Sequence, residues 1–429
     1  MNTTSNIQCL FPHNANFEAL TSMRATLPFA DDVIDALGAL SSAILKDGRS
    51  RQYPDVVTFA FFIRRSNLLA LKNNFQLYGY HRDFCHDSAY QEDLVCSRYS
   101  KNSTFNFQLR LGRGVVFHIA PSNVPINFGY SMVAGLLAGN NNVVRVSQKE
   151  FPQVDLIAEL MNNVYEQGNA DALGRVALVK YDRSDKEATD YFSSICNARV
   201  IWGGDATISK IRESEIPARS FDVCFADRYS MAAINADELV SEQNIGLLAD
   251  EFYNDTYLFD QNACSAPHLV VWTGSEENIC KAKELFWNAV HDVVSKKYQF
   301  QSVMAVDKQT ALFRQAVAMN ITQEGFKDNL LRRVELKELD SRIDEYRCTC
   351  GYFTEYTATS LDELDKIIKN KYQTLVYYGF EHSELEQFVL KNRLIGIDRI
   401  VPIGHTTDFD LIWDGYDLIN TLSRVVSVK

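Results

Sequence analysis

The sequence lacks an apolar run long enough to cross a membrane. Its longest apolar region, residues 114–139, is interrupted by His118, Pro121 and Pro125, whereas a membrane-spanning helix needs about 20 consecutive apolar residues. Residues 1–6 contain neither the basic nor the apolar segment of a secretory signal. We therefore expect a protein without a membrane span that stays in the cytoplasm.

Positive charge is also scarce. The chain has 43 lysines and arginines against 55 aspartates and glutamates, which gives a formal net charge of -12. A nucleic-acid-binding protein needs a basic face that displaces counterions from the phosphates. This charge balance therefore argues against a role in binding DNA or RNA.

The cysteines form neither a disulfide framework nor a metal-binding pattern. The count of nine is odd and the spacing is irregular, which is typical of reduced thiols in a reducing compartment. Cys348 and Cys350 are separated by one residue and have no second Cys/His pair nearby, so we expect no metal site. The usual dinucleotide fingerprint GxGxxG is absent as well.

The sequence does contain a repeated alternation of short apolar runs and amphipathic helices. The first hundred residues are mainly helical, with helices expected at 31–46 and 54–72. Further on, strands are expected at 115–120, 143–146, 175–180 and 198–202, and helices at 128–137, 153–165, 184–194 and from 205. Such βαβ units predict an α/β fold with a parallel, doubly wound sheet, an architecture typical of nucleotide binding.

A second α/β block follows the first. Short runs at 221–225 and 230–234 close the first block. The second is expected to contain strands at 268–272 and 374–378, long helices within 275–321, and helices at 361–369 and 383–391. The aromatic-rich tail must pack back on the core. We therefore divide the chain into a helical and dinucleotide-binding region (1–236), a catalytic domain (237–395) and a C-terminal segment (396–429).

The best phosphate site is the turn after the strand at 198–202. Gly203 and Gly204 would let the backbone approach a pyrophosphate beneath the N-terminus of the helix that begins near Asp205. We therefore expect all three residues to bind the cofactor. Two alternatives stay open: the glycines form only a tight turn, and Asp205 is only the N-cap of the helix.

The end of the strand at 143–146 is basic. Arg145 and Lys149 stand where an acidic residue would bind the ribose of NAD, and cations there suit the 2′-phosphate of NADPH. NADPH is therefore the expected cofactor. The alternative is that both cations simply cap the end of the strand in solvent.

Cys264 is the candidate nucleophile. It lies in a polar loop just before the strand at 268–272, where a substrate can reach it. A thiolate adds to a carbonyl or thioester, and an amide donor can stabilise the oxyanion that develops. His118 and His268 lie in or at the start of strands, so we expect both to be structural histidines rather than bases.

Several segments together resemble the LuxC-type fatty acyl-CoA reductases, which belong to the aldehyde dehydrogenase superfamily. The similarity extends from about residue 105 to 425, and its segments are Val116–Pro125, Val133–Asn140, Ile201–Asp205, Asp260–Ser265, Arg399–Gly404 and Trp413–Gly415. The resemblance implies an aldehyde dehydrogenase-like fold. It implies that Cys264 is the catalytic cysteine and that Asn123 supplies the oxyanion amide, with Ser122 beside it expected at the cofactor.

One departure from the superfamily pattern concerns water activation. Members that oxidise aldehydes to free acids have a Glu-Leu-Gly-Gly-Lys segment whose glutamate activates water. Here the corresponding segment is Cys224-Phe225-Ala226-Asp227-Arg228, without a glutamate. An acyl-enzyme should therefore persist until hydride or a thiol such as CoA takes the acyl group.

The expected function is the NADPH-dependent reduction of a long-chain acyl-CoA or acyl thioester to the aldehyde through an acyl-cysteine intermediate. The resemblance further implies an acyl-protein synthetase or acyl transferase as partner, and a homo-oligomer. Two alternatives stay open. A hydrolytic aldehyde dehydrogenase would need a carboxylate base such as Glu251 or Asp260, and a non-redox acyl-carrying subunit would keep the thiol without binding NADPH.

Overall fold

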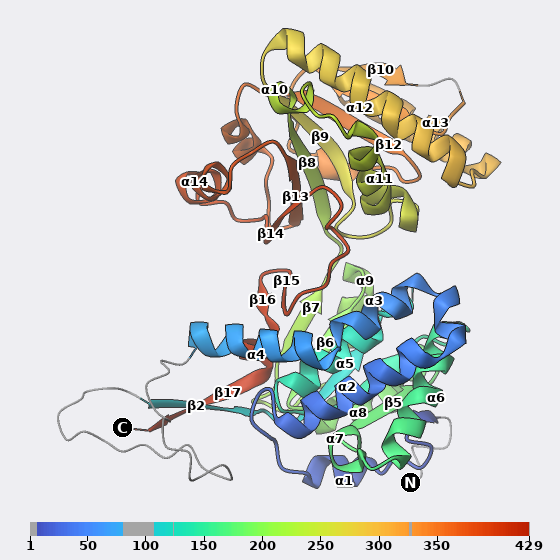
Figure 1. Ribbon diagram of the computed structural model, residues 1–429, viewed down its shortest axis with the longest axis vertical. Coiled ribbons are helices and arrows are strands. Elements are labelled where there is room, and N and C mark those ends of the chain that lie inside the picture. The colour runs from blue at the N-terminus through green and yellow to red at the C-terminus, as the bar shows by residue number, and fades with distance from the viewer. Residues whose placement is uncertain (1–6, 80–106, 123, 326–327, 429) are drawn as a thin grey trace, which may run out of the picture. The chain divides into compact units, whose positions relative to one another are not determined.

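A computed structural model describes residues 7–79, 107–122, 124–325 and 328–428 (Figure 1). The chain forms two compact units: unit 1 comprises Met1–Ala226 and Tyr416–Lys429, and unit 2 comprises Asp227–Gly415. The C-terminal segment is thus divided between the units. The functional domain boundaries expected after residues 236 and 395 stay a prediction.

Unit 1 is built on a six-stranded sheet. Its strands, in spatial order, are β1 (Gln8–Phe11), β5 (Val176–Lys180), β4 (Asn141–Val146), β3 (Val115–Ile119), β6 (Ala198–Trp202) and β7 (Asp222–Phe225). All neighbours are parallel except β1, which pairs antiparallel with β5. Every residue of β3 is buried, as expected for a parallel strand covered on both faces.

Helices lie on both faces of this sheet, and some pack on other helices rather than on the strands. The helices of unit 1 are α1 (Phe17–Ser22), α2 (Asp31–Lys46), α3 (Pro54–Phe62), α4 (Arg65–Gly79), α5 (Asn127–Leu137), α6 (Pro152–Glu166), α7 (Ala170–Leu173), α8 (Lys186–Ile195), α9 (Asp205–Ile211) and α15 (Leu418–Leu422). The apolar cluster on one face joins residues of α1, α8 and α9 to the strands, while α2 packs against α6 near the other face.

Two features of unit 1 differ from the sequence-based expectation. The single helix expected at 54–72 is two helices, because the chain turns between α3 and α4, where the Asn67 amide donates to the Phe62 carbonyl (2.7 Å). An antiparallel ribbon, formed by β2 (Phe107–Gly112) and β17 (Ser423–Val428), was not predicted.

Unit 2 contains a seven-stranded sheet. In spatial order its strands are β10 (Ile321–Gly325), β11 (Arg332–Leu336), β12 (Tyr352–Thr357), β9 (Pro267–Thr273), β8 (Tyr229–Asn235), β13 (Tyr372–Tyr378) and β14 (Arg399–Pro402). All neighbours are parallel except β10, which pairs antiparallel with β11. The short strand β15 (Ile412–Trp413) lies near the end of the unit.

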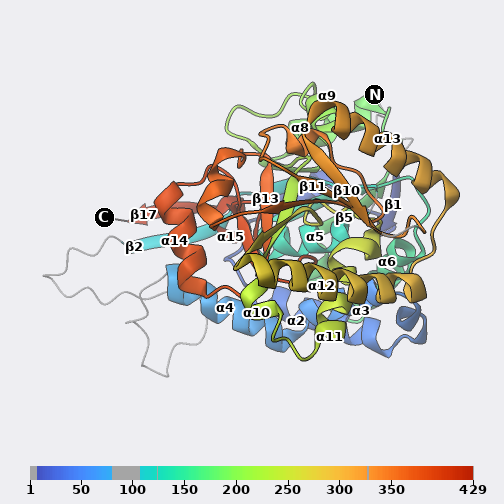
Figure 2. The same ribbon diagram turned by 90° about the horizontal axis from the view of Figure 1, so that it is seen from above.

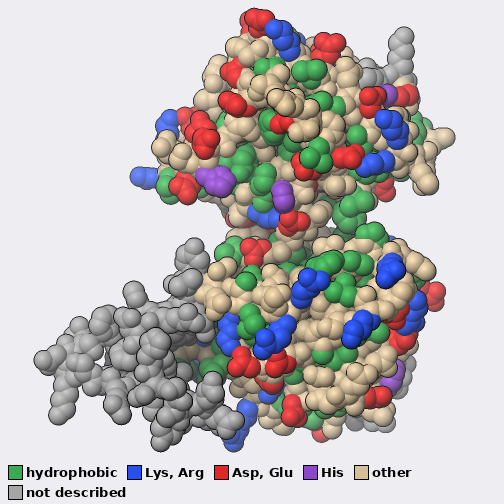
Figure 3. Space-filling view, viewed as in Figure 1, with side chains coloured by type: hydrophobic (Ala, Val, Ile, Leu, Met, Phe, Trp, Pro, Cys, Tyr) green, Lys and Arg blue, Asp and Glu red, His purple; other side chains and the backbone are tan. Residues whose placement is uncertain are grey.

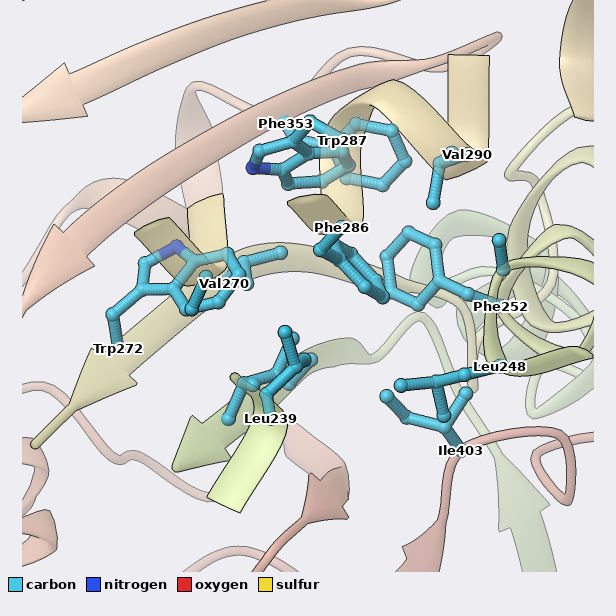
Figure 4. Close-up of a cluster of buried hydrophobic side chains, with 14 of the residues drawn as sticks. Leu239, Leu248, Phe252, Val270, Trp272, Phe286, Trp287, Val290, Phe353 and Ile403 are labelled. Atoms are coloured by element: carbon cyan, nitrogen blue, oxygen red, sulfur yellow. The ribbon is translucent and has the colours of Figure 1, made fainter. Parts of the chain in front are cut away.

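One face of this sheet is covered by α10 (Ala236–Leu239), α11 (Ile245–Thr256) and α12 (Glu276–Lys297) (Figures 1 and 2). Figure 4 shows the core there, in which Phe252, Phe286 and Trp287 pack against one another. The other face is covered by α13 (Ser302–Ala318), α14 (His382–Asn392) and the short turns η3 (Ile343–Glu345) and η4 (Leu361–Lys366). The helix expected at 361–369 is therefore a 3₁₀ turn.

The two sheets, each parallel except for one edge strand, confirm the expected α/β fold.

Acidic and basic side chains are interspersed over the face shown in Figure 3. Among the described residues no helix is both long and apolar enough to span a membrane.

Candidate active site

The carboxyl edge of the unit 1 sheet has a switch point between β3 and β6. From β3 the chain passes to β4 and β5 on one side and then returns to β6 and β7 on the other. Ligands of open α/β sheets bind at such points, outside the carboxyl ends of the strands. The predicted cofactor residues lie at this edge, because Ser122 follows β3, Arg145 and Lys149 lie at the end of β4, and Gly203 follows β6.

The two glycines join β6 directly to α9. The N–H of Gly203 donates to the Phe225 carbonyl (3.1 Å), which attaches the turn to β7. Gly204 is the N-cap and Asp205 is the first helical residue, so the alternative that Asp205 caps the helix is wrong. A Cβ on Gly204 would meet no atom within 4 Å. The space beside this turn is therefore open.

Arg145 is turned toward the neighbouring strand. Its guanidinium lies 5.1 Å from the centre of the Tyr181 ring and donates to the Tyr181 carbonyl (3.3 Å). Burial lowers its pKa, and its buried Nε has no hydrogen-bond partner among the described residues. Arg145 therefore does not cap the strand in solvent and retains an unsatisfied donor, whereas Lys149 is exposed.

Asn123 lies outside the described residues, so its role as an oxyanion donor stays a prediction. Ser122, the residue before it, is exposed. On β3 the buried His118 contacts Ser131 Oγ (2.7 Å) and Asn142 Oδ1 (2.9 Å), and burial lowers its pKa to about 4. Such a histidine is neutral at pH 7, which agrees with the expected structural role.

His268, at the start of β9, is buried like His118. Its Nδ1 contacts the Cys348 carbonyl (3.1 Å), its ring stacks on Tyr229, and burial lowers its pKa to about 3. The described residues contain no cluster of His, Cys, Asp and Glu that could hold a metal ion. The contacts of His268 are thus those of a structural residue.

The loop that carries Cys264 connects α11 to β9 at the amino end of the unit 2 sheet. Gln261 adopts a positive φ of 60° and its side chain is buried. Its amide donates to the carbonyls of Pro267 (2.9 Å) and Tyr352 (3.2 Å). It also accepts from the N–H of Gly351 (3.0 Å). These bonds fasten the loop to β9 and β12 just before the cysteine.

Ser230 on β8 holds the backbone of Cys264. Its buried hydroxyl donates to the Cys264 carbonyl (2.7 Å) and accepts from the N–H of Thr374 (3.2 Å) on β13. Strand pairing is irregular on both sides of Ser230, toward β9 and toward β13. Because bulges redirect side chains next to active sites, this irregularity lets one hydroxyl join the loop to β13.

The thiol of Cys264 is exposed, yet the protein around it changes its pKa. Burial raises its pKa, the charge of Asp414 raises it further, and a backbone hydrogen bond at Arg228 lowers it. The thiol is therefore mostly protonated near neutral pH. It needs a proton acceptor when it attacks, since the thiolate is the nucleophilic form.

The segment that replaces the glutamate motif begins at the end of β7. Cys224 and Phe225 are the last residues of that strand. Asp227 pairs with Arg347 (2.6 Å) and Lys371 (3.4 Å). Although burial opposes them, these cations lower the pKa of Asp227. Its carboxylate is held in ion pairs and is a weak base.

Two other carboxylates were candidates for a hydrolytic base. Asp260 accepts from the Tyr298 hydroxyl (2.5 Å). Glu251, on α11, packs so closely beside Gly404 that a Cβ there would lie 2.9 Å from the Glu251 Cβ. The Asp260 carboxylate is therefore bound within unit 2, and the Glu251 side chain packs against a glycine of the same unit.

A buried carboxylate that sequence reasoning missed fastens the C-terminal part of unit 2. Asp255 accepts from the N–H groups of Gly404 (2.6 Å) and Thr406 (3.0 Å) and from the Thr406 hydroxyl (2.8 Å). Burial raises its pKa to about 6 against the opposing effect of these bonds. Helix α11 also contains Asp250 and Glu251, so no sequence pattern distinguishes Asp255 from these two carboxylates.

The chain is similar to known proteins over most of its length. Residues 87–426 match the family model of acyl-CoA reductase (LuxC). A long-chain acyl-protein thioester reductase from Vibrio harveyi is 23% identical over 319 residues, which cover 73% of this chain and 63% of that protein. The match thus spans less than two thirds of the relative's length.

Solved aldehyde dehydrogenases share the fold. A 1-pyrroline-5-carboxylate dehydrogenase from Thermus, with bound NAD, has a TM-score of 0.60 at 13% identity, covering 96% of this chain and 83% of that one. Aldehyde dehydrogenase 21 from Physcomitrella patens, in complex with succinate, has a TM-score of 0.62 at 12% identity, covering 96% and 88%. These likenesses confirm the aldehyde dehydrogenase-like fold. Because the family model matches residues 87–426, the chain belongs to the acyl-CoA reductase (LuxC) family.

Proposed function

We propose that this protein reduces a long-chain acyl-CoA or another acyl thioester to the aldehyde through an acyl-Cys264 intermediate. The observation that carries the proposal is the exposed thiol of Cys264 in a loop fastened by Ser230 and Gln261. A rigid loop presents the sulfur in one position, as nucleophilic catalysis requires. Family membership gives this thiol an acyl thioester as its substrate class.

The first step is acyl transfer. The sulfur of Cys264 attacks the thioester carbonyl, and the thiol of the acyl donor leaves. We assign Asn123 and the backbone N–H of Cys264 as donors that stabilise the oxyanion of the tetrahedral intermediate. Ser230 donates a hydrogen bond to the Cys264 carbonyl and so limits rotation of the peptide group between Cys264 and Ser265. It is a positioning residue.

The carboxyl edge of the unit 1 sheet fits a nicotinamide dinucleotide. The turn at Gly204 is open, and the buried Arg145 Nε lacks a partner among the described residues. Gly203 would leave room for the phosphates, and the backbone N–H groups of Gly204 and Asp205 at the N-terminus of α9 would hold them, with Ser122 at the neighbouring strand end. When bound, the cofactor would supply the hydride that reduces the acyl group. The relative from Thermus is described with bound NAD, and we assign NADPH to this chain because Arg145 and Lys149 suit a 2′-phosphate.

Replacing Arg145 and Lys149 together by alanine should weaken a preference for NADPH over NADH by about tenfold or more, the equivalent of one hydrogen bond to a charged group. NADH has no 2′-phosphate, so its binding should change little. Dissociation constants from nucleotide fluorescence titration would measure both. Lys180→Ala, at the end of β5, is the control. Equal affinities of the unmodified protein for NADH and NADPH would refute the assignment.

We also propose a partner that delivers the acyl group. The Vibrio harveyi relative is named for an acyl-protein thioester, and an acyl-protein synthetase or acyl transferase would supply one here. A homo-oligomer and a cytoplasmic location complete the proposal.

The function is tested by incubating the protein with acyl-CoAs of several chain lengths plus NADPH. We expect oxidation of NADPH, measured by absorbance, in step with aldehyde identified by mass spectrometry. Acyl loading of Cys264 without NADPH binding would instead indicate an acyl carrier without redox activity.

A further inference from the structure

A continuous set of contacts connects Cys264 to a buried carboxylate. The Cys264 carbonyl is bonded to Ser230, and Ser230 accepts from the N–H of Thr374. The residue before Thr374 is Gln373, whose buried amide donates to the Asp414 carboxylate. Three residues, Ser230 of β8 and Gln373 and Thr374 of β13, thus connect the backbone of Cys264 to the Asp414 carboxylate within unit 2.

An irregularity of β13 produces this arrangement. Tyr372 pairs with Tyr229 and Leu375 pairs with Met231, so both Gln373 and Thr374 lie opposite the single residue Ser230. Such a bulge turns adjacent side chains away from their regular directions. The backbone of Thr374 is thereby placed on Ser230 while the Gln373 side chain reaches Asp414.

Asp414 differs from the other carboxylates around it. Asp227 is paired with Arg347, and Asp398 is paired with Arg228. Asp414 has no ion pair among the described residues, and a neutral amide is its hydrogen-bond donor. It has a positive φ of 49° and only 7% exposure. A non-glycine residue held in that region is uncommon and marks a functional constraint in many proteins.

We propose that Asp414 carries the proton of Cys264 during acyl transfer. As the sulfur bonds to the thioester carbonyl carbon, the Asp414 carboxylate accepts the proton of the Cys264 thiol. When the tetrahedral intermediate collapses, the bond to the donor sulfur breaks and Asp414 gives that proton to the departing thiolate. The products are the acyl-cysteine and the free donor thiol, with the carboxylate restored. This inference rests on the proposed function, because it needs an acyl thioester at Cys264.

The charges around Cys264 and Asp414 agree with this role. Among the charges that act on the Cys264 thiol, that of Asp414 has the largest effect. Burial raises the pKa of Asp414 to about 6, against the opposing effects of Gln373, Arg228 and Arg399, while the charge of Asp398 also raises it. A carboxyl group with this pKa is ionised at pH 7 and close to the optimum for exchanging protons there.

The test compares Asp414→Asn with the unmodified protein in two reactions of the same thiol. One is acyl loading from acyl-CoA in the absence of nucleotide, followed by quenched-flow mass spectrometry. The other is alkylation by iodoacetamide, whose rate follows the thiolate. Asp408→Asn is the control, because Asp408 is an exposed aspartate of the same C-terminal part of unit 2.

We expect Asp414→Asn to slow acyl loading about a hundredfold at pH 7, the usual contribution of a positioned acid-base group. Alkylation should become faster, because removing a negative charge lowers the pKa of the thiol. Acyl loading of the unmodified protein should rise with pH as Asp414 ionises. Gln373→Leu removes a bond that stabilises the carboxylate, so it should move that rise to higher pH.

Opposite changes in the two rates would support the proposal, since a misplaced thiol would slow in both reactions. Parallel loss of both rates, or unchanged acyl loading, would overturn it. If the unmodified protein takes up no acyl group at all, the proposed function fails instead.

Discussion

Replacing Cys264 by alanine should abolish covalent loading of the protein from an acyl-CoA. A thioester can form only on sulfur, and the loop held by Ser230 and Gln261 presents this sulfur to solvent. Intact-protein mass spectrometry after incubation with acyl-CoA would show one added acyl group on the unmodified protein and none on the variant. The fold should be retained, because the removed sulfur is exposed and fills no part of the core.

Cys280 supplies a matched control for this experiment. It is also exposed, but it lies on helix α12. Cys280→Ala should therefore load one acyl group at the rate of the unmodified protein. An adduct on Cys264→Ala that hydroxylamine removes would identify a different nucleophile and refute the assignment.

Unit 1 could be predicted from sequence because its strands are buried on both faces. A buried parallel strand is a nearly continuous apolar run, and β6 begins and ends at the expected residues, Ala198 and Trp202. The helices α6 and α8 have one apolar face each and were found by their period, whereas α5 is buried on all sides and reads as an apolar run. The antiparallel strand β1 lies at the sheet edge, and its four residues were too few to give a pattern.

The strands β11 and β12 were not predicted because they carry charge into the core, and the edge strand β10 was not predicted because its residues 322–324 are polar and exposed. Glu355 on β12 is fully buried and accepts from the indole N–H groups of Trp272 (2.8 Å) and Trp287 (2.7 Å). It also pairs with Arg333 of β11 (2.7 Å). Because Arg333 and Glu355 neutralise each other across two strands, neither strand is a continuous apolar run in the sequence. This pairing can be recognised only when the structure places the two strands side by side.

The same limit applies to the active site. Cys264 could be proposed as the nucleophile from sequence because it lies in a polar loop of small residues just before a strand. Ser230, Gln373 and Asp414 could not, since their importance depends on two strand irregularities and on contacts between residues far apart in the sequence. Asp414 lies in the segment Trp413–Gly415, which resembles the family, but the sequence alone assigns no role to this residue.

Given an aliphatic aldehyde and NADP⁺, the enzyme should form a thioester on Cys264 and then stall until CoA is added. The segment Cys224–Arg228 provides no glutamate to activate water, and its one carboxylate, Asp227, is held by Arg347 and Lys371. A thiol attacks with less assistance, because it is a few per cent thiolate near neutral pH and intrinsically more nucleophilic than water. Without CoA, NADPH formation should stop at about one equivalent per active site, because each acyl-cysteine forms once and is not released.

Product analysis decides between the two outcomes. With CoA present, acyl-CoA should accumulate over many turnovers and free acid should stay near the background set by the Cys264→Ala variant. Free acid formed over many turnovers without CoA would mean that a carboxylate activates water. Glu251→Gln, Asp260→Asn and Asp414→Asn would then identify it, because only the variant that lacks the base should stop at one equivalent. Asp414 is the first to examine, since it has no ion pair among the described residues and acts electrostatically on the Cys264 thiol.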